Sequence, residues 1–204
     1  MGPKKDKGGK GKIDTSPMLR PGEAPAHGKL VNEFVHIFVD DQNIFWGIVN
    51  ADRGISYRID FGKLMFAACR TGGGKGRAVK TAYIAGVIPD NDSFWEAAKA
   101  KGWEVKRGYL GYGNRSKQDD AYLITEITST LYEKPGPSTL VIVAGDADYV
   151  PPLEKAISKG WRVEVVFVKE GVSWALAPVT HEFRLITAAE IEYNPKWNVM
   201  DYWD

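Results

Sequence analysis

Two continuous apolar runs constrain the fold of this chain more than any other feature. They cover Phe34 to Val39 and Leu140 to Ala144, and neither alternates between apolar and polar residues. A strand with one face in water alternates, whereas a strand that is buried on both faces does not. We therefore predict that both runs are parallel strands that are buried on both faces of a sheet.

Segments with helical spacing separate the strand-like segments along most of the chain. The predicted strands are Phe34 to Val39, Val79 to Ala85, Trp103 to Tyr109, Leu140 to Ala144 and Trp161 to Val168. The predicted helices are Ile59 to Arg70, Asp92 or Ser93 to Lys101, Asp119 to Tyr132, and Pro151 or Pro152 to Gly160. This alternation predicts an α/β fold of three layers, with a mainly parallel central sheet of about five or six strands and helices on both faces.

The chain divides by composition into a tail, one domain and a short extension. Residues 1–30 are rich in Gly, Pro and Lys and carry net charge +4, so that the other residues of this chain of net charge +1 sum to −3. A segment with so few apolar residues cannot offset its ordering entropy, and we predict that it is a disordered basic tail. We place the domain at residues 31–190 and a C-terminal extension at 191–204. Any affinity for a polyanion must then come from the tail or from local patches.

The sequence also bears on cellular location. No stretch approaches the roughly 20 apolar residues that span a bilayer, and residues 1–30 lack the apolar core of a secretory signal. Cys69 is the only cysteine, so no disulfide can form within the chain. We expect a soluble intracellular protein, most simply cytoplasmic. Trp197, Tyr202 and Trp203 are expected either to pack over the domain or to join copies of the chain in a homo-oligomer.

Acidic residues follow both apolar runs. Asp40 lies in VDDQN after the first run, and Asp146 and Asp148 lie in VAGDADYVP after the second. The carboxyl ends of parallel strands share one edge of a sheet, where α/β proteins bind ligands. Carboxylates gathered there repel one another unless a cation or a shared proton compensates, and Mg²⁺ or Mn²⁺ are hard ions that take oxygen ligands. The sequence therefore predicts a metal-dependent enzyme that acts on phosphate esters.

Asp120 is the third candidate position, in KQDDAYL at the start of a predicted helix. At 100° per residue it lies on the apolar stripe of that helix, which passes through Leu123, Ile127 and Leu131. An inward-facing carboxylate is unusual unless it is paired or metal-bound, although it can also simply complement the helix N-terminus. Asn43 has the spacing from Asp40 to orient a water or phosphate, and the alternative is that it terminates the strand.

Two basic segments are candidates for contact with RNA. Arg70, Lys75 and Arg77 surround a glycine-rich loop and could follow a phosphate backbone. The segment RGYLGYGNRSK mixes aromatic and basic side chains, a combination that suits stacking on unpaired bases. Its candidate residues are Arg107, Tyr112, Arg115 and Lys117.

Three short motifs occur in an order that resembles a known family. VDDQN is similar to the D-G-x-N motif of the NYN domain, a branch of the PIN-like nucleases, KQDD to its K-G-x-D motif, and AGDADYVP to its S-G-D-x-D-F motif. The resemblance extends from about Val35 to Ile186. It implies a flavodoxin-like PIN fold and cleavage of RNA, with single-stranded RNA as the partner and Mg²⁺ or Mn²⁺ as cofactor. The matching catalytic positions are Asp40, Asn43, Asp120, Asp146 and Asp148, of which Asp40, Asp120 and Asp146 would bind the metal.

The chain departs from the family pattern at several positions near the expected site. Asp41 replaces a glycine, Ala144 replaces Ser or Thr, and Glu126 matches a later helical Asp of the family. His181 stands where the family often has another Asp. We hold Asp41, Glu126 and His181 as possible outer residues of the site.

Three classes of function remain open from the sequence. The first is a metal-dependent ribonuclease. The second is an NYN-type module with a degraded site that binds RNA or recruits partners, favoured by Ala144 and His181. The third is a phosphoacceptor domain of the receiver type, suggested by the paired Asp residues after the first strand and by Lys169, although the order of its candidate residues does not fit.

Overall fold

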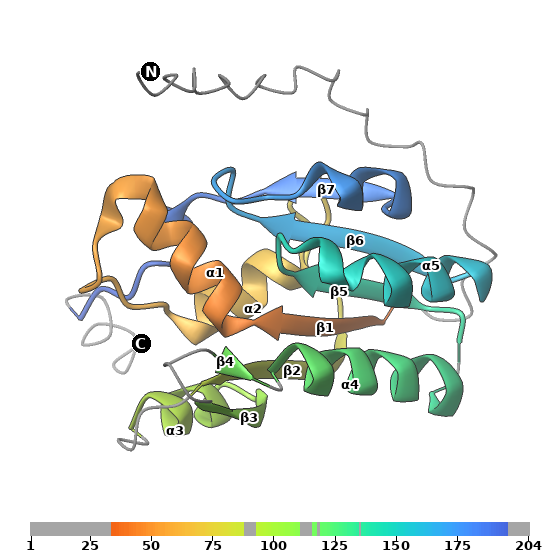
Figure 1. Cartoon of the computed structure of the whole chain (residues 1–204), viewed down its shortest axis with the longest axis horizontal. Helices are drawn as coiled ribbons and strands as arrows, with labels where there is room; N and C mark the ends of the chain where they lie inside the picture. Colours follow the sequence, from red (N-terminus) through yellow and green to blue (C-terminus); the bar gives the residue numbers. More distant parts are fainter. Residues whose placement is uncertain (1–33, 88–92, 111–115, 118, 135, 196–204) are drawn as a thin grey trace, which may run out of the picture.

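The computed structural model describes residues 34–87, 93–110, 116–117, 119–134 and 136–195. Within these ranges the chain forms a sheet in the order β4-β3-β2-β1-β5-β6-β7. The parallel strands are β1 (Val35–Asp40), β2 (Val79–Val87), β3 (Glu104–Leu110), β5 (Thr139–Val143), β6 (Arg162–Phe167) and β7 (Glu182–Leu185). The short strand β4 (Ser116–Lys117) pairs antiparallel with β3. The predicted α/β class with a mainly parallel sheet is confirmed (Figure 1).

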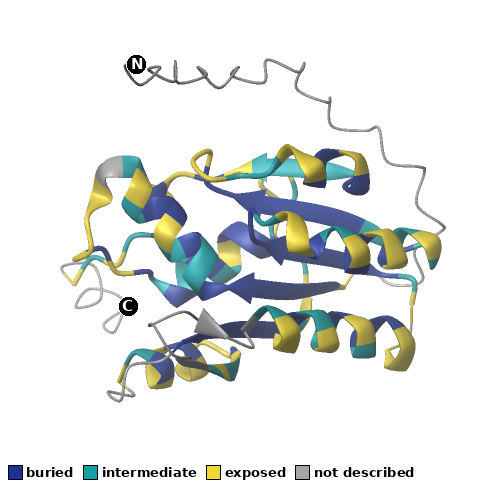
Figure 2. Cartoon of the chain, viewed as in Figure 1, coloured by how far each residue is buried: buried dark blue, intermediate teal, exposed yellow. Residues whose placement is uncertain are grey.

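Strand β1 lies at the centre of the sheet and is buried on both faces, as its apolar run predicts. All of its residues are buried, and it pairs in parallel with β2 on one side and with β5 on the other. Its side chains divide between two cores: Ile37 and Val39 belong to one cluster, and Phe38 belongs to the other. Figure 2 shows the buried sheet between helices whose outer faces are exposed.

Helices cover both faces of the sheet. On the face of Ile37 lie α1 (Asp41–Ile48), α2 (Phe61–Cys69) and α3 (Ser93–Ala100), and on the face of Phe38 lie α4 (Asp119–Glu133) and α5 (Val150–Ser158). Four short helical segments complete the described chain: η1 (Val49–Arg53), η2 (Ala147–Tyr149), η3 (Trp174–Val179) and η4 (Ala188–Ile191). The result is the predicted three-layer arrangement (Figure 1).

The strand order reverses direction at β1 and β5. From β1 the chain passes to β2 and β3 on one side, and it then returns to β5, β6 and β7 on the other. In sheets of this kind, ligands bind beyond the carboxyl ends of the strands at the point of reversal. Asp40 ends β1 at this point, and Gly145 and Asp146 follow β5. The fold therefore brings two of the three predicted acidic positions to one edge.

Helix α1, the strands β4 and β7 and the four short helical segments were not expected from sequence. Helix α1 begins directly after β1 because Asp40 caps it, accepting a hydrogen bond from the backbone of Asn43. Strand β7 lies at the edge of the sheet, and its burial is only partial. It therefore lacks the continuous apolar run that identified the central strands.

Candidate active site

Asp40 faces two partners at the carboxyl edge of β1. Its Oδ1 accepts a hydrogen bond of 2.9 Å from the Asn43 backbone, and its Oδ2 accepts one of 3.0 Å from the Tyr149 hydroxyl. The side chain is buried, with 3% of the residue exposed. A carboxylate so withdrawn from water requires hydrogen bonds or a positive charge to offset its lost hydration.

Asp120 approaches the same hydroxyl from the first turn of α4. Its Oδ1 lies 3.3 Å from the Tyr149 hydroxyl oxygen. Asp120 is half-buried, and Leu123 and Ile127 of the same helix are fully buried. The structure thus brings Asp40 and Asp120 together, although 80 positions separate them in sequence.

Tyr149 is the residue that joins this pair, and sequence reasoning assigned it no role. Its side chain is fully buried, and burial raises its pKa far above the ordinary value, with the charges of Asp40 and Asp120 adding to the effect. The hydroxyl therefore stays protonated. It has one proton and two carboxylate acceptors, so it can donate to only one of them at a time.

Asn43 connects the ends of the two central strands. Its Oδ1 accepts a hydrogen bond of 2.6 Å from the backbone N–H of Gly145. A side chain at position 145 would not fit, because its Cβ would lie 2.6 Å from a ring carbon of Phe167 and 3.1 Å from the carbonyl oxygen of Gly171. Asn43 lies within α1, so it does not terminate β1 as the alternative reading of the sequence had it.

Asp146 and Asp148 lie in the loop beyond β5, next to Gly145. Asp146 is half-buried and caps η2, because its Oδ1 accepts a hydrogen bond of 3.1 Å from the Asp148 backbone. Asp148 is exposed. Over the described residues, no group of three or more His, Cys, Asp or Glu side chains is placed to hold a metal ion. The expected cluster of four carboxylates is thus a close pair with two neighbours in the adjoining loop.

The three possible outer residues of the site, Asp41, Glu126 and His181, contact other parts of the protein. Asp41 is buried on the face of the sheet that α3 covers. A Cβ added to Gly86 would lie 2.9 Å from the Cβ of Asp41. Glu126 forms an ion pair of 3.0 Å with Lys106. His181 lies at the start of β7, where its Nδ1 accepts a hydrogen bond of 3.0 Å from the Val163 backbone. Since Val163 lies at the amino end of β6, His181 belongs to the edge opposite Asp40, and its expected place near the site is not supported.

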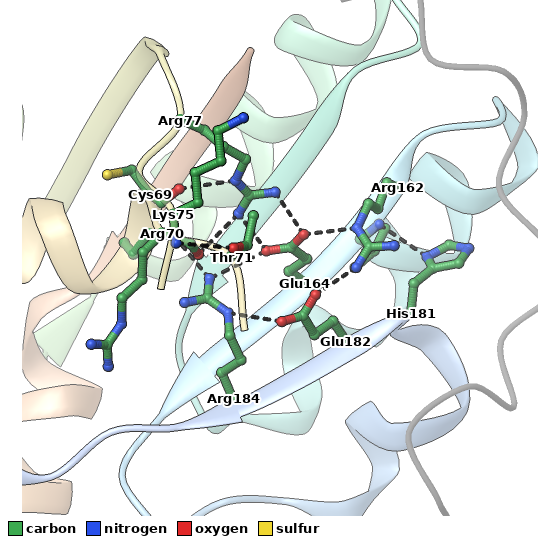
Figure 3. Close-up of polar contacts among 12 residues, drawn as sticks. Cys69, Arg70, Thr71, Lys75, Arg77, Arg162, Glu164, His181, Glu182 and Arg184 are labelled. Carbon is green, nitrogen blue, oxygen red and sulfur yellow. Dashed lines mark hydrogen bonds and ion pairs between the residues drawn. The ribbon is translucent and has the colours of Figure 1, made fainter. Parts of the chain in front are cut away.

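The first basic segment, which contains Arg70, Lys75 and Arg77, also lies at the amino edge of the sheet. Its arginines form hydrogen bonds and ion pairs within the protein there (Figure 3). Arg77 donates to both carboxylate oxygens of the fully buried Glu164, at 2.8 and 2.6 Å, and to the carbonyl oxygen of Cys69. Arg70 forms an ion pair with Glu190. Arg77 is therefore bound within the protein and is no longer a candidate for phosphate contact.

The remaining predicted RNA contacts are only partly described. Lys75 is exposed in the glycine-rich loop at the amino edge, and Arg107 is exposed in the middle of β3, where it pairs with Gly86 of β2, one residue beyond the partner of Asp40. Tyr112 and Arg115 lie outside the described residues, and only the backbone of Lys117 is described, in β4. Arg107 is thus the described member of this set that lies on the same edge as Asp40.

Trp46 is a further exposed aromatic residue that the sequence did not single out. It lies one helical turn after Asn43 in α1, and half of the residue is exposed. Its ring packs edge-on against Phe45, at 5.5 Å between ring centres. An exposed indole on the helix that begins after Asp40 offers a face on which an unpaired base can stack.

The likeness to known proteins agrees with this architecture. Residues 34–187 match the family model of the NYN domain. The chain belongs to the NYN domain family. The NYN domain is a PIN-like domain whose members are generally regarded as ribonucleases, which agrees with the resemblance found in the three motifs. The receiver-type alternative is not supported by this match.

A solved structure has a similar fold. It is the crystal structure of a protein of unknown function from Vibrio parahaemolyticus, with a TM-score of 0.63 and 18% sequence identity. The likeness covers 79% of this chain and 96% of that one. No curated protein matches the chain significantly. In the part of the NYN protein that the structure describes, no helix is long and apolar enough to cross a membrane.

Proposed function

We propose that this NYN protein is a divalent-metal-dependent ribonuclease whose site lies at the carboxyl edge between β1 and β5. The observation that carries the proposal is the placement of Asp40 and Asp120 on the single hydroxyl of Tyr149. Carboxylates brought together at one point repel each other, and a divalent cation bound there would offset that repulsion. Family membership supports RNA as the substrate class.

The residues present fit Mg²⁺ or Mn²⁺. The donors at this edge are carboxylate oxygens, which hard cations prefer, and no cysteine or histidine stands among them. Mg²⁺ is commonly held by one or two carboxylates, with water and substrate phosphate completing its shell. A pair of carboxylates therefore suffices, and a closed cage of protein ligands is not required.

Asp40 and Asp120 would hold the cation, with Asp146 as a further candidate ligand. Once bound, such an ion would activate water and stabilise the charge that develops on the phosphate. Asn43 ties α1 to the loop after β5 through Gly145, the residue before Asp146. Asp148, which is exposed beside Asp146, is placed to meet substrate or solvent.

Single-stranded RNA is the substrate form that the described surface favours. Trp46 offers an exposed ring one turn after Asn43, and Arg107 offers a cation at the same edge. Unpaired bases stack on aromatic side chains, whereas the bases of a duplex are already stacked on one another. The strand would pass over the edge with a base on Trp46 and its phosphates toward Arg107.

Cleavage of labelled RNA tests the proposal. Single-stranded and structured RNAs are incubated with the full chain in Mn²⁺, Mg²⁺ or EDTA, and the expected result is cleavage of the single strand that EDTA prevents. Asp40→Asn is expected to abolish it. Asp60→Asn is the matched control, because Asp60 also caps a helix, α2, through the backbone of Gly62 and Lys63. Equal cleavage by Asp40→Asn and the parent would refute the proposal.

A second candidate function is an NYN module that binds RNA or recruits a partner without cutting. The observation in its favour is that no three acidic, His or Cys side chains of the described residues are placed to hold a metal. Binding of RNA with no cleavage in either metal would support this alternative.

A further inference from the structure

Tyr149 is held firmly by its surroundings. It lies in η2, directly before α5, and its ring belongs to the same buried cluster as Phe38, Leu123 and Leu153. These residues come from β1, α4 and α5, so the ring is packed against the elements that carry the two carboxylates. Side chains in a close-packed interior occupy one position, and the hydroxyl oxygen is thereby fixed.

The hydroxyl is the donor that the two carboxylates share. Asp40 ends β1, whereas Asp120 begins α4, and the chain between them passes through β2 and β3. Their spacing therefore depends on contacts in the folded protein more than on the local chain. The hydroxyl oxygen lies 3.0 Å from an oxygen of Asp40 and 3.3 Å from an oxygen of Asp120, so both carboxylates lie beside one fixed point, and the proton can be donated to either.

A hydrogen bond from the neutral Tyr149 hydroxyl is compatible with a cation on the same carboxylates. An ionised carboxylate has about four lone-pair directions. The hydrogen bond from Tyr149 uses one of those of Asp40. Carboxylates that bind metals are themselves commonly held by hydrogen bonds from outer residues, and these outer residues govern the affinity for the metal.

We propose that Tyr149 is a positioning residue that sets the spacing of Asp40 and Asp120 for a divalent cation. It acts through its hydroxyl, and it does not itself touch the reacting atoms. The inference rests on the proposed function, because it assumes that this pair binds the metal. It assigns a role to the hydroxyl oxygen of Tyr149, the atom that distinguishes Tyr from Phe.

The affinity of the full chain for Mn²⁺, measured by titration calorimetry, tests this role. We expect Tyr149→Phe to weaken binding by about tenfold or more, the effect of losing an outer hydrogen bond at a metal site. Tyr57→Phe is the matched control, because Tyr57 is also buried and donates its hydroxyl, to the carbonyl oxygen of Ala188. That variant should bind Mn²⁺ as the parent does. Equal affinity of Tyr149→Phe and the parent would overturn the inference.

Cleavage at increasing Mn²⁺ separates positioning from general damage. We expect Tyr149→Phe to need a higher Mn²⁺ concentration for half-maximal cleavage and to approach the parent rate at saturation. A variant that was merely less stable would lose rate at every concentration of the metal, and that result would also overturn the inference. A parent that neither binds Mn²⁺ nor cleaves RNA would refute the proposed function, and the inference with it.

A measurement that keeps the Tyr149 hydroxyl tests the inference even if the Tyr149→Phe variant fails to fold. Fluorotyrosine is placed at position 149 of the full chain, and its fluorine resonance is followed by NMR as Mg²⁺ is added. We expect the resonance to shift and to saturate together with binding measured by calorimetry. A resonance that stays unchanged while Mg²⁺ binds would show that the ion does not reach the Tyr149 contact, and would overturn the inference.

Discussion

The Oδ1 atom of Asn43 accepts a hydrogen bond of 2.6 Å from the backbone N–H of Gly145, and this contact joins α1, which follows β1, to the loop that follows β5. The two residues lie 102 positions apart in sequence, and the contact spans the point where the strand order reverses. One side-chain amide thus ties together the two halves of the sheet at their carboxyl ends. Gly145 is itself buried, so its N–H has no access to bulk water.

Asn43→Ala is expected to lower the free energy of unfolding by about 1 to 3 kcal/mol, the cost of leaving a buried donor unsatisfied. Urea denaturation measures this change. Gln42→Ala removes the neighbouring amide of the same helix and should cost clearly less. We also expect Asn43→Ala to reduce RNA cleavage by more than its loss of stability explains, because the loop of Asp146 is released from β1.

The carboxylate pair is expected to act as one unit. Asp40→Asn and Asp120→Asn should each reduce cleavage by about 100-fold or more, and the double variant should be no worse than either single one, since groups that act together are not additive. Rates of cleavage at fixed RNA and Mn²⁺ measure this. Without metal, Asp120→Asn should melt at the parent temperature or above, because one of two repelling charges is gone. Losses that multiply in the double variant would contradict a shared role.

Stability should fall between about pH 7 and pH 5 because of His36. Burial, with smaller contributions from the charges of Lys134 and Lys80, lowers the pKa of His36 to about 4. In the unfolded chain its pKa is about 6.5, so in this range the unfolded state binds the proton and the folded state does not. The contribution of neutral His36 to the free energy of unfolding is fully present above about pH 6.5. It is lost as the pH falls toward 4, and the loss is about 2 kcal/mol at pH 5.

His36→Gln removes this titration while keeping a polar partner for Thr81, whose Oγ1 lies 2.9 Å from the Nδ1 of His36. Urea denaturation of parent and variant at both pH values gives the difference in free energy. A parent and a variant that lose the same stability would assign the pH dependence to other groups.

The arginine network at the amino edge is expected to matter for stability alone. Burial by itself would raise the pKa of Glu164, but hydrogen bonds and charges from Arg77, Arg162 and Arg184 outweigh it and hold that pKa below its usual value. Glu164→Gln leaves these cations without their anion and should cost about 3 to 5 kcal/mol. The cleavage rate per folded molecule should stay unchanged, because the network lies at the opposite edge from Asp40.

Glu182→Gln is the matched control for Glu164→Gln. Glu182 meets two of the same arginines, but 23% of its side chain is exposed, whereas the side chain of Glu164 is fully buried. Water can therefore compensate for the lost charge, and the cost in unfolding free energy should be smaller. Equal costs for both variants would mean that burial is not what makes Glu164 important.

Deleting residues 1–30 tests whether the basic tail binds RNA. The melting temperature should change little, since the tail has few apolar residues, and RNA affinity should fall, because the residues that remain carry net charge −3. Each lost phosphate contact flattens the dependence of log affinity on log salt by about 0.7 for a single strand. Affinities at several salt concentrations give this slope. An unchanged slope would leave Arg107 and the segment after it as the candidate contacts.

The sequence predicted the centre of the fold better than its borders. The central strands are recognisable because burial on both faces requires a continuous apolar run, as in Val35–Asp40 and Thr139–Val143. Strand β7 has no such run, and α1 was hidden because Asp40 both ends a strand and caps a helix. Because Asp40 serves as both strand end and helix cap, the sequence has no separate capping residue that would mark the start of α1.

The candidate site was predictable only where it depended on strand ends and helical angle. Those features bring Asp40 and Asp120 to one edge, and the structure places the two side chains on a common hydroxyl. Tyr149 itself was not found, because the family motif has Phe at its place and an aromatic residue before a helix is usually core. Arg77 was misjudged for a related reason: its partner Glu164 lies 87 positions away, inside a strand whose other residues after Arg162 are apolar.

The glycine-rich loop before β2 is a natural point of attachment for a probe or a tether. Gly73, Gly74 and Lys75 are exposed, and the loop is closed at its base by the Thr71 and Arg77 contacts. Exposed loop tips of this kind tolerate inserted sequence well. Because the loop lies at the amino ends of the strands, a fluorophore or a surface linker placed there would leave the carboxyl edge open to RNA, so that single molecules could be immobilised with their candidate site facing solution.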